Sequence, residues 1–179
     1  MQEVQTRIPE LVLGEFKDSD LETLVEYMND PVVYQNTLTI PHPYSEQDGL
    51  NYLEHVKTFE RLNGKRKDWA IRYHDELIGS IGLLYNHGLE SHRSEIGYWL
   101  AKPHRGKGLM SICVHAFSRY ILNSLPITRV EAHVFAHNPT SSRVLEKSGF
   151  TREGYIRGGF MKDGVALDAY FYSLLRDDL

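Results

Sequence analysis

The stretch that decides the predicted fold is EIGYWLAKPHRGKGLM, residues 95–110. Its first part, up to Leu100, is rich in aromatic and β-branched residues and predicts a strand. After a turn with Gly106 and Gly108, apolar residues recur at three- and four-residue spacing from Leu109 onward, which predicts a helix. A strand, a basic glycine turn and a helix in this order can present unpaired backbone N–H groups to a phosphate.

Two well-known phosphate-binding loops do not fit this turn. A Walker A loop needs a glycine where Ala101 stands and a hydroxyl residue where Gly108 stands. A dinucleotide-binding loop needs a third glycine at Ser111, and it needs an acidic residue after the next strand, where residues 135–138 offer none. A nucleotide-binding regulator is therefore the function that the turn supports least.

A third pattern, Arg/Gln-x-x-Gly-x-Gly/Ala after a strand, does fit. It is similar to the loop of acetyl-CoA-binding transferases; Arg105 and Gly108 occupy it, and Met110 stands at its last place. Arg105 and Lys107 are expected to add positive charge for a phosphate or pyrophosphate. The alternative is a turn whose glycines are required only for its shape.

Composition limits the class of protein. The 179 residues are enough for one domain with its own core, and the net charge of -4 with a pI near 6.1 gives no sign of a nucleic-acid or membrane partner. The N-terminus has no signal-peptide pattern, and the single cysteine, Cys113, excludes an intrachain disulfide. We therefore expect a cytoplasmic protein whose residues 10–179 form a single domain.

The hydrophobic pattern of the whole chain predicts a mixed α/β fold. Strands are expected at 11–16, 69–73, 77–85, 93–100, 130–136, 150–160 and 165–175. About four helices are expected, at 18–28, 45–63, 109–121 and 138–149, with an irregular stretch over 31–44. The strand, helix, strand order on either side of residues 109–121 is a crossover unit, so those two strands should run parallel.

A second motif, NPTSSRVLEKSGF at residues 138–150 followed by Glu153 and Gly154, adds specificity. Together with the first stretch it resembles the GNAT N-acetyltransferases, and most of all the RimJ/RimL-type enzymes that acetylate the N-termini of ribosomal proteins. The resemblance runs from about residue 11 to the end. It implies a GNAT-like acyl-CoA N-acyltransferase fold, in which a mostly antiparallel central sheet contains one splayed parallel strand pair.

The resemblance also implies a set of acetyl-CoA-binding residues. The glycine turn would hold the pyrophosphate, the strand before it would pair with the pantetheine arm, and the second motif would contact the thioester region. The implied residues are Ile96, Gly97, Tyr98, Trp99, Leu100, Arg105, Gly106, Lys107, Gly108, Leu109, Met110, Asn138 and Ser141.

The catalytic roles are implied in the same way. Ser141 would protonate the departing thiolate, since this family often has a hydroxyl there. Some relatives carry a glutamate proposed as general base where this chain has Phe160. Glu95 matches a glutamate that is frequent in the central strand of the superfamily, and it is the expected base here, acting through a water.

The expected reaction is direct acetyl transfer to an amine in a ternary complex. A protein N-terminal α-amine, such as that of a ribosomal protein, is the favoured acceptor. The alternatives are a small amine (a polyamine, amino acid or aminoglycoside) and a non-catalytic acyl-CoA-binding module. The residues expected to contact the acceptor are Tyr34, His42, Tyr44 and Tyr155.

The nine histidines do not form a metal-binding pattern. His133 and His137 fall on one face of a predicted strand, but four residues along a strand is too far apart for both to bind one ion. We expect no metal, and the chain is expected to be a monomer or a homodimer.

Overall fold

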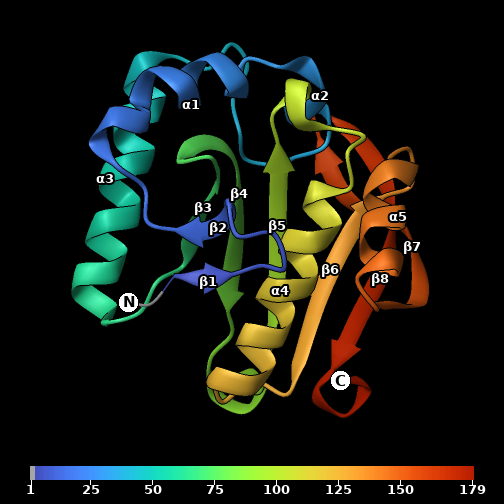
Figure 1. The fold of residues 1–179 in the computed structure, drawn as a ribbon. Coiled ribbons are helices and arrows are strands. Elements are labelled where there is room, and N and C mark those ends of the chain that lie inside the picture. Colours follow the sequence, from blue (N-terminus) through green and yellow to red (C-terminus); the bar gives the residue numbers. More distant parts are fainter. Residues whose placement is uncertain (1–2) are drawn as a thin grey trace. The chain divides into compact units, whose positions relative to one another are not determined.

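The structure, a computed structural model, describes residues 3–179 and contains two compact units. The first unit contains the chain up to Gly82 together with Tyr98–Leu109. The second unit contains Leu83–Gly97 and Met110–Leu179. Two strands, β4 (Glu76–Tyr85) and β5 (Arg93–Leu100), run from one unit into the other (Figure 1).

The first unit combines antiparallel strands with three helices (Figure 1). Its strands pair in the order β1-β2-β3-β4. The strands of this unit whose bounds have not yet been given are β1 (Val4–Gln5), β2 (Leu11–Gly14) and β3 (Asp68–Tyr73). The helices are α1 (Leu21–Met28), α2 (Pro31–Gln35) and α3 (Glu46–Asn63).

Helix α3 shows how local sequence signals determine the ends of an element in this unit. At its start the side chains of Ser45 and Asp48 each bond the other's backbone N–H, the reciprocal box that the sequence predicts. At its end Gly64 takes the left-handed conformation, with φ of 63°. Its inner face contributes Leu53 and Val56 to a core shared with α1 and the strands.

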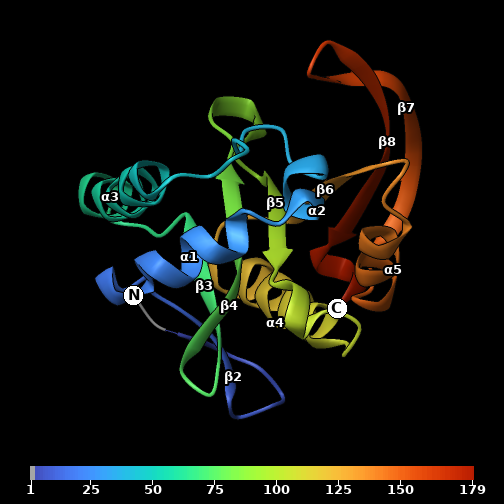
Figure 2. The ribbon, with the colours of Figure 1, turned by 90° about the horizontal axis from the view of Figure 1, so that it is seen from above.

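The second unit holds the crossover and the closing hairpin. Its strands pair in the order β5-β6-β8-β7, and only the β5–β6 pair is parallel. Figure 2 shows the hairpin strands β7 and β8 as one long, curved ribbon. The elements not yet named are α4 (Leu109–Ser124), β6 (Arg129–Phe135), α5 (Pro139–Lys147), β7 (Thr151–Lys162) and β8 (Val165–Leu175).

The parallel pair is short. The β5–β6 register begins at Arg93 with Arg129 and ends at Glu95 with Glu131. Strand β6 continues to Phe135, where it is still paired with β8 on its other side. The predicted parallel pair, with two strands that separate after a few residues, is therefore confirmed.

All four predicted helices are present as α1, α3, α4 and α5. The additional helix α2 lies in the stretch that was expected to be irregular. It forms because Pro31 occupies its first position and the Asp30 side chain accepts a hydrogen bond of 2.9 Å from the Val32 N–H. Among residues 3–179, none of the helices is both long and apolar enough to cross a bilayer.

We expect the buried ion pair of Arg72 and Asp20 to be essential for the stability of the first unit. The Arg72 Nη2 and Asp20 Oδ2 atoms are 2.6 Å apart, and both side chains are 6% exposed. Asp20→Ala leaves a buried guanidinium without its partner and should lower the free energy of unfolding by about 3–5 kcal/mol. Urea unfolding followed by circular dichroism measures this loss.

The control is Lys17→Ala, which removes the exposed ammonium that is paired with Asp75 at 2.9 Å. Because solvent already screens that pair, its removal should leave the free energy of unfolding almost unchanged. Equal losses for Asp20→Ala and Lys17→Ala would show that burial of the pair does not matter.

Candidate functional site

The glycine turn before α4 has the backbone that the sequence predicts. Gly106 and Gly108 have φ angles of 76° and 77°, in the left-handed region that disfavours side chains. A Cβ atom added at either position would meet nothing within 4 Å, so conformation rather than space requires glycine there. Both glycines and Lys107 are exposed, and α4 begins at Leu109. The turn can therefore present backbone N–H groups and one flexible cation to an anion.

Arg105, which was expected to add positive charge for a phosphate, makes contacts within the protein. Its Nη1 atom lies 2.7 Å from Asp30 Oδ2, and its Nε–H donates to the Leu100 carbonyl at 2.7 Å. The other oxygen of Asp30 caps α2. The guanidinium thus fixes the turn to the end of β5 and to the start of α2, which leaves Lys107 as the exposed cation of the turn.

At the end of β5, two backbone groups already have hydrogen-bond partners within the protein. The Leu100 carbonyl is occupied by Arg105, and the Ala101 N–H donates to the Ile78 carbonyl at 2.8 Å. Residues 96–99, which precede these contacts, are the rest of the strand that was predicted to pair with the pantetheine arm. In this part Ile96 and Trp99 are buried while Gly97 is exposed.

Glu95 has a partner that sequence reasoning missed. Its Oε1 atom is 2.9 Å from Nδ1 of His133 on β6, with side-chain exposures of 36% for Glu95 and 22% for His133. The signal was present in the alternation of the strand. Glu95 and Glu131 face each other in the parallel register, and His133, two residues further, lies on the same face of the sheet.

The His133 ring is held between aromatic side chains of the hairpin. The Phe171 ring centroid lies 4.9 Å away, and Phe160 packs edge-on at 5.3 Å. Phe160 also packs edge-on against Phe135, at 5.7 Å. The position where some relatives were expected to carry a glutamate is therefore an apolar wall beside His133.

The charges around this pair explain its electrostatics. The neighbouring Glu131 is buried, and it is neutralised by Arg93 at 3.0 Å and Arg129 at 2.7 Å. The hydrogen bond that the ring donates to Glu95 raises the pKa of His133 above its ordinary value of 6.5. Partial burial of the ring opposes this rise, and the charges of Glu95 and Glu131 add to it.

The second motif begins α5 and ends beside β6. Asn138 accepts a hydrogen bond of 3.2 Å from the Ser141 N–H, so it caps α5 as its sequence position predicts. Ser141 is half-buried in the first turn. The motif's Glu153 is bound by Arg129 and by the Ser173 hydroxyl, which lower the pKa of its carboxyl to about 2. Glu153 thus has a structural role in the second unit.

The residues predicted to contact an acceptor fall in both units. In the first unit the rings of Tyr34 and His42 pack at 5.4 Å. Tyr44, by contrast, is 6% exposed and belongs to the core, because α1 and α3 close over its ring. In the second unit Tyr155 is exposed, and its hydroxyl donates to Asp168 at 2.5 Å.

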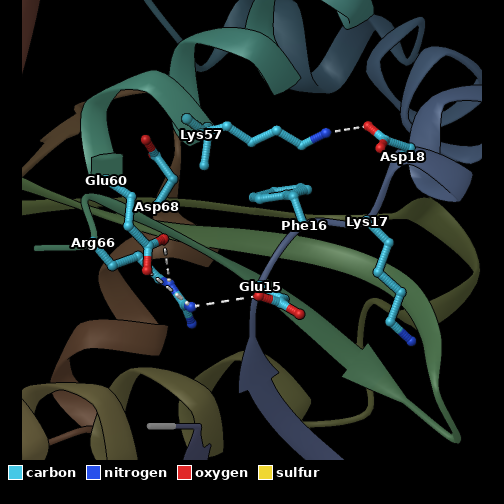
Figure 3. A pocket seen from close by; sticks show the side chains of 9 residues that line it. Glu15, Phe16, Lys17, Asp18, Lys57, Glu60, Arg66 and Asp68 are labelled. Atoms are coloured by element: carbon cyan, nitrogen blue, oxygen red, sulfur yellow. Dashed lines mark hydrogen bonds and ion pairs between the residues drawn. The ribbon is translucent and has the colours of Figure 1, made fainter. Parts of the chain in front are cut away.

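A cavity of about 290 Å³ lies in the first unit, away from all of these residues. Figure 3 shows pairs among its charged side chains: Lys57 points at Asp18, and Arg66 lies between Glu60 and Glu15. None of the predicted site residues lines this cavity. It therefore does not enlarge the candidate site.

Comparison with known proteins agrees with the sequence motifs. The model of the family described as "Acetyltransferase (GNAT) domain" matches residues 10–151. The N-acetyltransferase p20 of Bacillus licheniformis is 31% identical over 168 residues, covering 93% of each chain. The ribosomal-protein-serine acetyltransferase of Escherichia coli is 30% identical over 114 residues, which are 64% of this chain and 63% of the relative.

The solved structures include RimL, a ribosomal L7/L12 α-N-protein acetyltransferase in complex with coenzyme A. The TM-score is 0.87 at 19% identity, and the likeness covers 99% of this chain and 100% of RimL. At this identity the likeness shows that the fold is shared. The predicted mixed α/β fold of this type is thus confirmed.

The pairing of Glu95 and His133 predicts a measurable titration. The imidazole of His133, followed by NMR, should titrate above pH 6.5, and Glu95→Gln should lower its pKa because the negative partner is gone while burial remains. His115, exposed on α4, serves as the internal reference. A His133 pKa that does not respond to Glu95→Gln would contradict the pairing.

The same pair predicts how stability depends on pH. Since the folded-state pKa of His133 is raised, its stabilising contribution is complete below its ordinary pKa of 6.5 and is lost as pH rises through the raised value. The free energy of unfolding of the unmodified protein should exceed that of Glu95→Gln by more at about pH 6 than at about pH 9. Urea titrations at the two pH values test this difference.

Proposed function

Since the chain belongs to the GNAT acetyltransferase family, we propose that it transfers the acetyl group of acetyl-CoA directly to the α-amine of a protein N-terminus. The observation that carries the proposal is the β5, left-handed glycine turn and α4 arrangement of residues 95–124. The chain is an acetyltransferase of this family. Its acceptor and the roles of its residues are what we propose.

The cofactor would be held along one continuous segment. The pyrophosphate would bind the backbone N–H groups of Gly106–Met110 at the start of α4, where the helix dipole favours an anion, and Lys107 would add a full charge. The pantetheine arm would lie along Ile96–Trp99. The solved RimL structure contains coenzyme A, which supports this choice of cofactor.

The direction of β5 supports a proposal for where the reacting end of the cofactor would lie. From Leu100, beside the glycine turn, back to Glu95 the strand spans five residues, or roughly 17 Å. An arm that starts at the turn and runs back along β5 therefore brings its thioester toward Glu95. In this unit β6 no longer pairs with β5 beyond Glu95, so the backbone on that side is available to an extended ligand.

The chemistry requires that a proton leaves the acceptor. An ammonium cannot attack a thioester, and an α-amine with a pKa of roughly 7.7–8 gives up its proton more readily than a lysine at about 10.4. Glu95 would take part in accepting this proton. Asn138 would orient the cofactor, and the Ser141 hydroxyl would give a proton to the thiolate as the C–S bond breaks.

Several observations support the choice of acceptor and of compartment. The Escherichia coli relative is a ribosomal-protein-serine acetyltransferase, whose substrate is a protein. Tyr34 and His42 in the first unit and Tyr155 in the second would contact the acceptor chain.

Residues 10–179 would act as one catalytic domain. The cytoplasm would be its compartment, where the buried Cys113, its pKa raised by burial to about 12, would stay reduced.

We expect thiol release from acetyl-CoA when the protein is mixed with peptides that have a free N-terminus. The panel should contain peptides of varied first residues, the same peptides with blocked α-amines, polyamines, amino acids and aminoglycosides. Ser141→Ala should lower kcat by roughly 10- to 100-fold, since it removes a positioned proton donor. Ser91→Ala, an exposed serine in a turn of the second unit, is the control and should keep full activity.

Turnover confined to polyamines or aminoglycosides would overturn the α-amine proposal and leave the transferase reaction intact. Cofactor binding without turnover of any amine would instead indicate a non-catalytic acyl-CoA-binding module.

A matched pair of glycine variants tests the cofactor site. Gly108→Ala should weaken coenzyme A binding by about tenfold, roughly 1.4 kcal/mol, because alanine resists the left-handed backbone of the turn. Gly88→Ala introduces the same strain, at a φ of 63° with no atom within 4 Å of the new Cβ, in a different turn. Isothermal titration calorimetry should therefore find normal affinity for Gly88→Ala. Equal losses of affinity in the two variants would argue against the turn as the binding site.

A further inference from the structure

We propose that His133 is the residue that takes the proton from the acceptor ammonium, and that Glu95 acts through it as a positioning residue. This inference rests on the acetyl-transfer reaction proposed above and assigns its general base. It replaces the water that was expected between Glu95 and the amine with the imidazole of His133.

The first support is the way the two ring nitrogens are used. Nδ1 lies 2.9 Å from Glu95 Oε1, so in the neutral ring it is the protonated nitrogen and donates to the carboxylate. This leaves the lone pair on Nε2, for which the residues described in the structure provide no hydrogen-bond partner. A carboxylate that fixes the tautomer and leaves one basic nitrogen available is the arrangement that general-base catalysis needs.

The second support is the fixed position of the ring. Phe171 at 4.9 Å and Phe160 at 5.3 Å pack against the imidazole, while Glu95 holds one of its edges. The side chain still has 22% of its surface exposed. Because the ring is already oriented, little reorganisation is needed when the proton moves. Its exposed edge leaves it accessible to solvent and substrate.

The third support is electrostatic. The charged groups that face the ring are Glu95 from β5 and Glu131 from β6, and the latter is paired with Arg93 and Arg129. From β7 and β8 the ring meets Phe160 and Phe171, which carry no charge. Together, the two carboxylates outweigh the burial of the ring and raise the pKa of His133 above 6.5, toward the pKa of an α-amine. A general base is most effective when its pKa lies near the working pH.

The place of His133 in the strand pair agrees with this role. Glu95 occupies the last paired position of β5, and His133 lies two residues beyond the last paired position of β6. The pair therefore stands where the two strands separate, which is where the proposed thioester end of the cofactor arrives.

The proton balance of the reaction closes with these residues. Nε2 takes one proton from the bound ammonium, which gives an imidazolium and a neutral amine. The amine nitrogen bonds to the thioester carbon, the C–S bond breaks, and the second proton from nitrogen reaches the thiolate by way of the Ser141 hydroxyl. The imidazolium then releases its proton to solvent, so the net products are an amide, free coenzyme A and one proton.

The experiment compares kcat at saturating acetyl-CoA and an N-terminal peptide from the assay panel, across pH, for three variants. His133→Asn keeps an amide N–H near the Nδ1 position that can still donate to Glu95, but it has no proton acceptor in place of Nε2. Glu95→Gln keeps a hydrogen-bond acceptor for the ring but removes the charge. His115→Gln, exposed on α4, is the control.

His133→Asn should lower kcat by about 100-fold, and the remaining rate should rise with pH only as the bound amine loses its own proton. Glu95→Gln should keep the acid limb of the profile but move it to lower pH. His115→Gln should match the unmodified protein. Circular dichroism and thermal unfolding of each variant show whether the fold is retained.

Three results would overturn the inference in distinguishable ways. If the unmodified protein acetylates the peptide and folded His133→Asn keeps its rate and its pH profile, His133 is not the base and the proposed function stands. If Glu95→Gln loses the acid limb entirely while His133→Asn keeps it, Glu95 is itself the base. If the unmodified protein acetylates no amine in the panel, the proposed function fails and this inference fails with it.

Discussion

The structure depends on the early end of the parallel ladder between β5 and β6. Three paired positions, from Arg93 to Glu95, join the strands, and β6 then continues with β8 alone. Backbone groups left unpaired inside a sheet are costly unless a ligand or water bonds them. In the cofactor site proposed above, the pantetheine arm would lie along β5 where this ladder has ended. The glycine turn at the end of the same strand would bind its pyrophosphate.

The last paired position also creates an electrostatic problem that the fold solves with different partners. Glu95 and Glu131 face each other across the pair, and like charges at facing positions repel. Two arginines neutralise the buried Glu131, whereas Glu95 bonds a single histidine that can give its proton away. Of the two carboxylates, Glu131 is thus paired with arginines, and only Glu95 is hydrogen-bonded to a histidine.

The sequence predicted most of the fold because its signals are local. The caps of α3 and α5, the left-handed glycines before α4 and the alternation in β6 each act within a few residues. What it missed depends on contacts between distant segments. The ion pair of Arg105 could not be predicted locally, because its partner Asp30 lies 75 positions earlier in the chain. His133 was considered only with His137 as a metal ligand, since its bond to Glu95 depends on how β5 and β6 pair. Tyr44 was expected to contact an acceptor, but its side chain is buried in the core of the first unit.

The pKa of the amine decides which class of acceptor is deprotonated at lower cost. Proton transfer costs about 1.36 kcal/mol for each unit by which the pKa of the donor exceeds that of the acceptor. An α-ammonium and a lysine ammonium differ by roughly 2.6 units, so any one base deprotonates the α-amine at a cost about 3.5 kcal/mol lower. If His133 is the base, Glu95 narrows the remaining gap for both amines by raising the pKa of the imidazole. The choice between a protein N-terminus and a lysine side chain would then follow from the amine itself and from the residues that position it, while the aromatic wall of Phe160 and Phe171 holds the ring in place.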